Sequence, residues 1–182
     1  MKYFRGFIAL QLADKVKDRL AAIQKKVQHH VQEGVFLRPQ NFHITLKFLG
    51  NVPVGHIPDL QQALATVAAR FDPFVTVTAE LGRFSSGRRS IIWLGLSQNE
   101  TLLRLVQELE DALLPVGYSR EFRPYQSHIT LIREAKLYGK FEQWSPRLSG
   151  HSLEIRHTAI SLMESVSDNR GVSYNEFFSI PL

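Results

Sequence analysis

The tetrapeptide His-Ile-Thr-Leu occurs twice in this chain of 182 residues, at His43–Leu46 and again, 85 residues later, at His128–Leu131. On a β-strand, residues i and i+2 share a face. Each copy therefore points its isoleucine and leucine to one side of a sheet and its histidine and threonine to the other. The repeat predicts two similar halves, each of which presents an imidazole beside a hydroxyl.

Other apolar patterns predict the rest of the secondary structure. Apolar side chains at steps of three and four indicate three helices, which begin near Asp14, Pro58 and Asn99. In the first helix we expect Asp14 as the N-cap, Val31 in the apolar stripe and Gly34 as the stop. We expect strands at Tyr3–Leu12, Phe42–Leu49, Phe74–Ala79, Ile91–Leu96, Ser127–Ile132, Leu153–Glu164 and Val172–Leu182, a basic loop at Arg83–Arg89 and an irregular connection at Leu137–Gly150.

These seven or eight strands pair off between the helices rather than alternate with them. This order favours an α+β fold with antiparallel sheets over a doubly wound fold. We expect two similar lobes around a central cleft, each an antiparallel sheet with helices on its outer side. Because no low-complexity linker divides the chain, residues 1–182 are expected to form one bilobal domain.

Composition excludes several classes of site. The chain has no cysteine, which excludes disulfides, thiolate metal sites and a cysteine nucleophile. Its 22 basic and 17 acidic residues give a net charge of +5, which permits a polyanionic ligand without requiring one. No apolar stretch approaches the roughly 20 residues that span a bilayer, so we expect a cytoplasmic protein with no membrane partner.

The two imidazoles suit general acid–base catalysis, in which one takes a proton from a nucleophile and the other protonates a leaving oxygen. The two threonine hydroxyls can then hold the non-bridging oxygens of a phosphate. A single His-x-Thr is usually an ordinary polar pair on a half-buried strand, whereas two in the same alternation favour a shared site. We expect no metal and no cofactor, because the remaining histidines lack partners at metal-ligand spacing: His29, His30, His56, His151 and His157.

Two His-x-Thr motifs at this spacing resemble those of the 2H phosphoesterase superfamily, and most closely its bacterial and archaeal RNA 2′,3′-cyclic phosphodiesterase branch, also called 2′-5′ RNA ligases. The resemblance covers nearly the whole chain. It includes Arg5–Leu10, Leu37–Phe42, Lys47–Gly50, Ile92–Gly95 and the closing Ser165, Gly171 and Tyr174. One position departs from the pattern, since Ser127 stands where the family commonly has proline before the second histidine.

The resemblance implies hydrolysis of RNA 2′,3′-cyclic phosphate ends to 2′-phosphate ends, with 2′-5′ ligation as the reverse reaction. It implies His43 as the acid to the leaving 3′ oxygen and His128 as the base to water, although the motifs themselves are symmetric on this point. Thr45, Thr130 and Arg133 would bind the phosphate, and Phe48 would contact the terminal base. Strict alternation puts Phe48 and Arg133 off the His/Thr face, so both strands must bend or stop there. The expected partners are RNA ends, tRNA halves among them, and the expected state is a monomer.

Two other functions are compatible with the same motifs. One is a phosphodiesterase for small cyclic-phosphate nucleotides, such as an ADP-ribose cyclic phosphate. The other is a non-catalytic module that binds RNA ends, although a decayed site would be expected to lose one of its His-x-Thr pairs. Arg83, Arg88 and Arg89 are candidates for RNA backbone contacts or for a solvated hairpin tip. Phe122, Arg123 and Tyr125 precede the second motif, and the two aromatic residues are candidates for base stacking or for core packing.

Overall fold

The structure is a computed structural model that describes residues 2–148, 152–168 and 171–182. The described residues form nine strands and four α-helices. The strands are β1 (Tyr3–Gln11), β2 (Val31–Phe36), β3 (His43–Pro53), β4 (Phe74–Ser86), β5 (Arg89–Leu96), β6 (His128–Leu137), β7 (Glu154–His157), β8 (Ala159–Asp168) and β9 (Gly171–Pro181). The helices are α1 (Asp14–Gln28), α2 (Ile57–Ala68), α3 (Glu100–Leu113) and α4 (Phe141–Leu148).

All nine strands belong to one curled antiparallel sheet, in the order β7-β4-β5-β6-β3-β1-β8-β9, with β2 on β6. The sheet consists of a five-stranded half, β7-β4-β5-β6 with β2, and a four-stranded half, β3-β1-β8-β9, which meet where β3 pairs with β6. That pairing is a single residue pair, Ile44 opposite Ile129, and beyond it β2 takes the place of β3 along β6. The two halves therefore diverge directly after the two His-x-Thr motifs, and this divergence opens the expected cleft.

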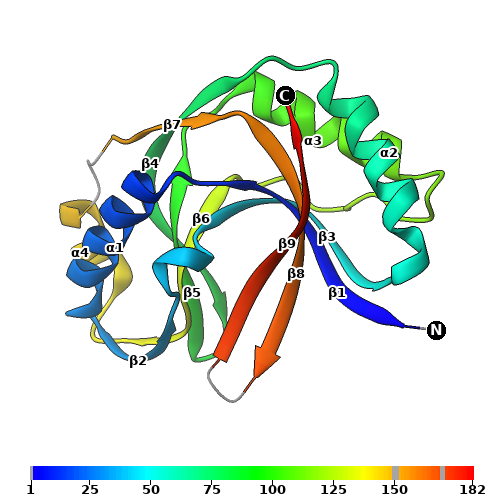
Figure 1. Ribbon diagram of the computed structural model, residues 1–182. Helices are drawn as coiled ribbons and strands as arrows, with labels where there is room; N and C mark the ends of the chain where they lie inside the picture. Colours follow the sequence, from blue (N-terminus) through cyan, green and yellow to red (C-terminus); the bar gives the residue numbers. More distant parts are fainter. Residues whose placement is uncertain (1, 149–151, 169–170) are drawn as a thin grey trace.

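The helices cover the outer side of each half. Helices α1 and α4 lie together beside β2, β4 and β6, whereas α2 and α3 lie together against β3, β8 and β9 (Figure 1). The two halves are not consecutive in the sequence. Helix α1 follows β1, which belongs to one half, but it packs on β2 and β6 of the other half. Ile44 and Ile129 are fully buried in the main core between sheet and helices. The α+β fold with two lobes and outer helices is thus confirmed.

The first helix is shorter than predicted. It ends at Gln28, and Val31–Phe36 forms strand β2 instead. Ala13 is the N-cap, so Asp14 is the first residue of the helix. Gly34 is not a helix stop either: a β-carbon there would lie 2.9 Å from Ile132 Cγ2. Glycine permits β2 to lie close against β6, and this pairing overrides the local helical pattern.

Three further predictions were wrong in extent. The basic loop Arg83–Arg89 is mostly hairpin, because β4 and β5 pair as far as Ser86 opposite Arg89 and leave only Gly87 and Arg88 in the turn. The irregular connection Leu137–Gly150 contains α4, and its last two residues lie outside the described residues. The strand Leu153–Glu164 is two strands that join different halves of the sheet, with β7 on β4 and β8 on β1.

Candidate active site

The two histidines are held by the same local contact. The Nδ1 atom of His43 lies 2.7 Å from the carbonyl oxygen of Asn41, and that of His128 lies 2.6 Å from the carbonyl oxygen of Gln126. A carbonyl oxygen can only accept, so Nδ1 carries the proton in both neutral rings. Each Nε2 is therefore unprotonated in the neutral ring and carries the lone pair that a base requires.

The strand register places both His-x-Thr pairs on one face. Ile44 and Ile129 are directly opposite and point into the core, so their neighbours on either side point the other way, toward the cleft. Thr45 lies beside its histidine, with Oγ1 3.0 Å from Nε2 of His43. The four predicted residues His43, Thr45, His128 and Thr130 thus gather around the point where the two halves meet.

A β-bulge follows each motif. The register of β3 against β1 shifts between Thr45 and Lys47, and that of β6 against β5 shifts between Thr130 and Ile132. At each bulge two consecutive side chains are buried, first Leu46 with Lys47, then Leu131 with Ile132. The buried Lys47 ammonium is compensated by Glu110, whose carboxylate lies 2.7 Å away.

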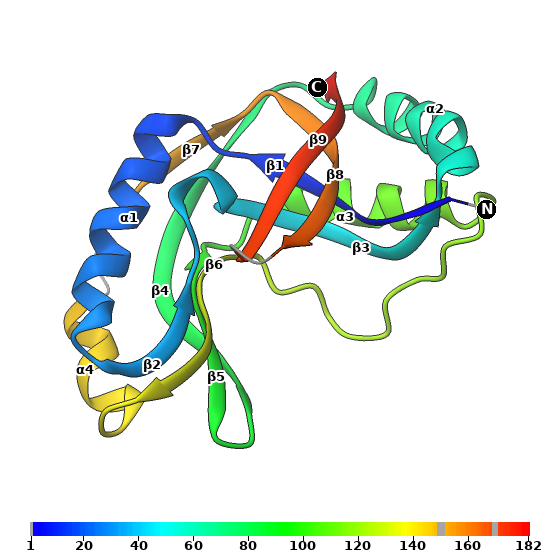
Figure 2. The same cartoon turned by 60° about the horizontal axis from the view of Figure 1, so that its bottom comes forward.

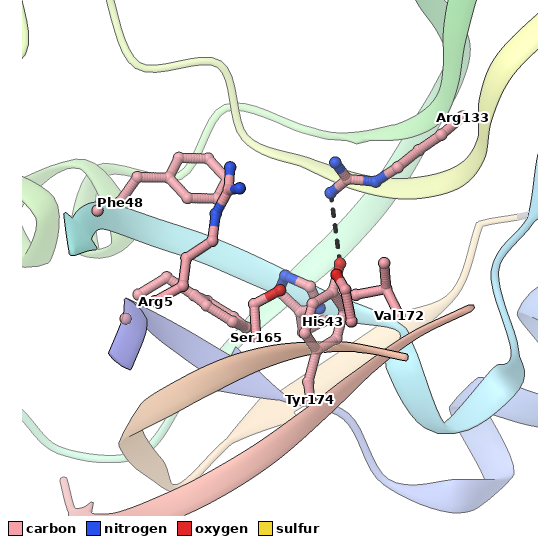
Figure 3. Close-up of a pocket in the computed structure, with 11 residues that line it drawn as sticks. Arg5, His43, Phe48, Arg133, Ser165, Val172 and Tyr174 are labelled. Carbon is pink, nitrogen blue, oxygen red and sulfur yellow. Dashed lines mark hydrogen bonds between the residues drawn. The ribbon is translucent and has the colours of Figure 1, made fainter. Parts of the chain in front are cut away.

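The two bulges reverse the alternation of side chains. Phe48 and Arg133, each five residues after its histidine, therefore return to the His/Thr face. Both line a cavity of about 230 Å³ together with His43 (Figure 3). The expected bend in each strand is a bulge, which brings these two residues to the site.

Arg133 spans the cleft between the two halves. Its Nη2 donates to the hydroxyl of Tyr174 on β9 at 3.4 Å (Figure 3). Its Nε is buried and has no hydrogen-bond partner among the residues that the structure describes. Arg133 lines the cavity, where its guanidinium cation is suited to an anion.

Aromatic side chains flank each histidine. The ring of His43 lies 4.9 Å from Phe7 and 5.0 Å from Tyr174. The ring of His128 lies 5.1 Å from Phe84 and 5.7 Å from Trp93. Sequence reasoning missed all four as site residues. Phe7, Trp93 and Tyr174 belong to segments that carry the family resemblance, which is the signal that could have identified them.

Burial makes both histidines hard to protonate. It is the main reason that the pKa of His43 falls to about 4, while the bond to the Asn41 carbonyl acts against this and the charge of Arg133 adds to it. Burial also lowers the pKa of His128, again with a contribution from Arg133. The charge of His128 contributes to the lowered pKa of His43, so the two sites interact. Without a ligand, both rings are neutral at pH 7.

Other candidates lie outside this constellation. Phe122 is fully exposed, whereas Tyr125 is half-buried and its hydroxyl donates to the Thr45 carbonyl at 2.9 Å, so it supports β3. Arg83 and Arg89 form ion pairs with Glu142 and Glu33. In the described part of the chain, no three His, Asp or Glu side chains are placed to hold a metal ion, and no helix is long and apolar enough to cross a membrane.

Comparison with known proteins is consistent with this geometry. The family model "LigT like Phosphoesterase" matches residues 10–93 and again 94–174, so each match contains one His-x-Thr motif. The RNA 2′,3′-cyclic phosphodiesterase of Bacillus subtilis (strain 168) is 31% identical over 148 residues, which are 81% of this chain and 80% of that protein. A protein of the same name from Geobacillus stearothermophilus is 32% identical over 169 residues, 91% of this chain, and the chain spans about half, 52%, of its length.

The fold also matches solved structures. TT0787 of Thermus thermophilus superimposes with a TM-score of 0.83 at 23% identity, over 98% of this chain and 97% of that one. Similarity at this identity concerns the fold alone. It agrees with the curled antiparallel sheet and the two flanking helix pairs described above.

Proposed function

Because the chain belongs to the LigT-like phosphoesterase family, we propose that it hydrolyses RNA 2′,3′-cyclic phosphate ends to 2′-phosphate ends. The observation that carries the proposal is the convergence of two histidines, each with its Nε2 unprotonated in the neutral ring, on the face that also holds Arg133. The relatives from Bacillus and Geobacillus bear the name of this activity.

In the proposed reaction, water attacks phosphorus in line with the bond to the 3′ oxygen. Nε2 of His128 takes a proton from the water as the O–P bond forms. Nε2 of His43 gives a proton to the 3′ oxygen as the P–O3′ bond breaks. The product carries a 2′-phosphate and a 3′-hydroxyl, and the two histidines have exchanged protonation states.

The phosphate is bound by hydroxyl and guanidinium groups. We assign Thr45 and Thr130 to the non-bridging oxygens, one from each half of the sheet. Arg133, which lines the cavity, is the cation that neutralises the charge of the phosphate. This set needs neither a metal nor a cofactor. Phe48, with 60% of its surface exposed at the cavity, is assigned to stack on the terminal base.

The assignment of acid and base rests on the family resemblance. Both rings donate Nδ1–H to a backbone carbonyl oxygen, but Nε2 of His43 also lies 3.0 Å from the Thr45 hydroxyl, and His43 is the more deeply buried. For His43 to act as the acid, the anionic phosphate must raise its pKa on binding, because an adjacent negative charge favours the imidazolium. Binding of substrate thereby creates the proton donor.

The decisive experiment is an assay in EDTA with an oligoribonucleotide that ends in a 2′,3′-cyclic phosphate. We expect a single product, which phosphorus NMR identifies as the 2′-phosphate. A 3′-phosphate product would contradict the assigned leaving group, and activity lost in EDTA and restored by a divalent cation would contradict the metal-free mechanism.

The same assay separates the alternative substrates. A small cyclic-phosphate nucleotide carries the same reacting group and is the competing substrate. We expect the oligonucleotide to have the higher kcat/KM, and tRNA halves are the natural ends that we propose to test. We further propose that the protein acts as a monomer in the cytoplasm.

A further inference from the structure

We propose that Phe84 and Trp93, beside His128, form a second nucleoside-binding platform that accepts the 5′-hydroxyl end of an RNA strand. The inference rests on the proposed function, because it assigns a substrate to the side of the same site where the nucleophile enters. The platform lies on the β4–β5 hairpin, which extends beyond β6 and β2 away from the body of the sheet (Figure 2).

The platform is built by a specific local arrangement. Trp93 stands opposite Gly82 in the hairpin, and a β-carbon at Gly82 would lie 2.1 Å from the indole ring. The missing side chain lets the indole lie flat across β4. Phe84, two residues further along the same face, lies 5.1 Å from the Trp93 ring and meets the His128 ring edge-on at 5.1 Å.

Phe84 leaves part of its ring open to solvent, with 39% of its surface accessible. Exposed aromatic rings beside a catalytic site are typical of surfaces that stack on nucleic-acid bases. Phe48, the other exposed ring at the site, lines the cavity with His43, the histidine assigned to the leaving oxygen. The two exposed rings thus belong to different halves of the sheet and flank different histidines.

Positive charge at the hairpin favours an RNA strand over an uncharged ligand. Arg88 lies in the turn, and Arg83 and Arg89 flank it. The ion pairs of Arg83 with Glu142 and of Arg89 with Glu33 are about half-exposed, at 2.9 Å each. Exposed pairs of this kind contribute little free energy, so their arginines can turn to phosphates that follow the 5′-terminal nucleoside.

In the proposed reaction, the 5′-hydroxyl of this nucleoside is the nucleophile. His128 is the proposed base, and a 5′-hydroxyl in place of water gives its proton to Nε2 of His128 as the O5′–P bond forms. The P–O3′ bond breaks, and His43 protonates the 3′ oxygen. Atoms and charges balance without another reactant, and the product is a 2′-5′ phosphodiester. The platform would raise the local concentration of this nucleophile relative to water.

The first test measures binding without catalysis. The chain has two tryptophans, so in a Trp144→Phe background the indole fluorescence reports Trp93 alone. A 3′-5′-linked diribonucleotide with a free 5′-hydroxyl is expected to quench it saturably. Phe84→Ala should weaken this binding about 5- to 100-fold, as expected for loss of one base–aromatic stack, while Phe48→Ala should retain the quenching. Absence of saturable quenching in the Trp144→Phe protein would overturn the proposal.

The second test measures partition between water and the 5′-hydroxyl. With a cyclic-phosphate mononucleotide and the same diribonucleotide, Phe84→Ala is expected to lower the ratio of 2′-5′-linked product to hydrolysis product at least 5-fold. Phe177→Ala removes a similarly exposed phenylalanine on β9 and should leave the ratio unchanged. An unchanged ratio in Phe84→Ala would refute the platform. A protein that hydrolyses no cyclic phosphate yet shows the quenching would instead refute the proposed function alone.

Discussion

Ile44 and Ile129 face each other as the only pair between β3 and β6 in the described sheet, and both side chains are completely buried. This pair is the centre of a pseudo-twofold relation between the two halves. On either side of it the chain repeats the same order: a histidine, a threonine, a bulge, and then a functional residue five positions after the histidine. Packing of two apolar side chains thus positions the proposed catalytic groups on the opposite face.

Removal of either histidine should abolish most of the activity without unfolding the protein. Each proton transfer contributes about 10²- to 10⁴-fold, so His43→Ala and His128→Ala should lower kcat by at least 100-fold. The double variant should be scarcely slower than either single variant, since the two groups act as a unit. Rates are measured with the cyclic-phosphate oligonucleotide, and circular dichroism verifies the fold.

A substrate with a nitrophenolate leaving group identifies the acid. This leaving group needs no proton, so it should restore the rate of the variant that lacks the acid and not of the variant that lacks the base. We expect rescue of His43→Ala. Rescue of His128→Ala alone would reverse the two roles, and full activity in both folded variants would refute the catalytic assignment.

The pH dependence should differ between free enzyme and complex. Lowered histidine pKa values mean that the singly protonated free enzyme becomes more abundant as pH falls below 6.5, so kcat/KM should rise from pH 8 toward pH 5. The bound phosphate anion raises both pKa values, so kcat should have its maximum at a higher pH than kcat/KM. NMR titration of the free protein is the independent check: a pKa above 6.5 for either ring would contradict the burial argument.

The sequence predicted that His43, Thr45, His128 and Thr130 share one face of the sheet because alternation and the repeated motif are local. It also predicted α2, α3 and the Asn99 cap, whose side chain accepts from the Leu102 N–H at 2.9 Å. It could not predict β2, since Val31–Phe36 becomes a strand only by pairing with β6, a hundred residues away. Local helical periodicity cannot reveal such a pairing.

The bulges were the other feature beyond the reach of alternation. A register shift depends on the neighbouring strands β1 and β5, which no local pattern identifies. One local feature marks each bulge: Phe48 follows Leu46-Lys47 and Arg133 follows Leu131-Ile132, and strict alternation would place both residues off the His/Thr face. Lys47 hides this feature, because a lysine is not expected to be buried unless a partner such as Glu110 is known.

Arg133 should matter more than the tyrosine that contacts it. Arg133→Ala removes the cation and an N–H donor at the phosphate, so kcat/KM should fall by about 10²- to 10³-fold. Arg133→Lys should restore little, because an ammonium cannot replace two N–H groups of the planar guanidinium. Tyr174→Phe removes only the 3.4 Å hydrogen bond and should cost less than about 10-fold. Equal losses in Tyr174→Phe and Arg133→Ala would show that the hydroxyl has a direct role.

His157 should make the protein less stable in acid. It is 1% exposed, its Nε2 lies 2.8 Å from Thr76 Oγ1, and its Nδ1 has no partner in the described ranges. Burial lowers its pKa from 6.5 to about 4. Between these values the unfolded chain binds more protons than the folded one, so the stability present above pH 6.5 is lost as pH falls toward 4. Linkage puts the loss at about 2–3 kcal/mol at pH 4.5.

Urea unfolding of the wild type and of His157→Gln at pH 7 and pH 4.5 measures this contribution. Glutamine keeps a polar group for Thr76 but does not titrate, so the variant should lose about 2–3 kcal/mol less free energy of unfolding on acidification than the wild type. The pKa of His43 is lowered in both proteins, so its contribution to the loss of unfolding free energy cancels in the comparison. His29→Gln, at an exposed position, is the matched control and should follow the wild type. If His157→Gln also follows the wild type, His157 is not the buried neutral group that the β4–β7 pairing makes it.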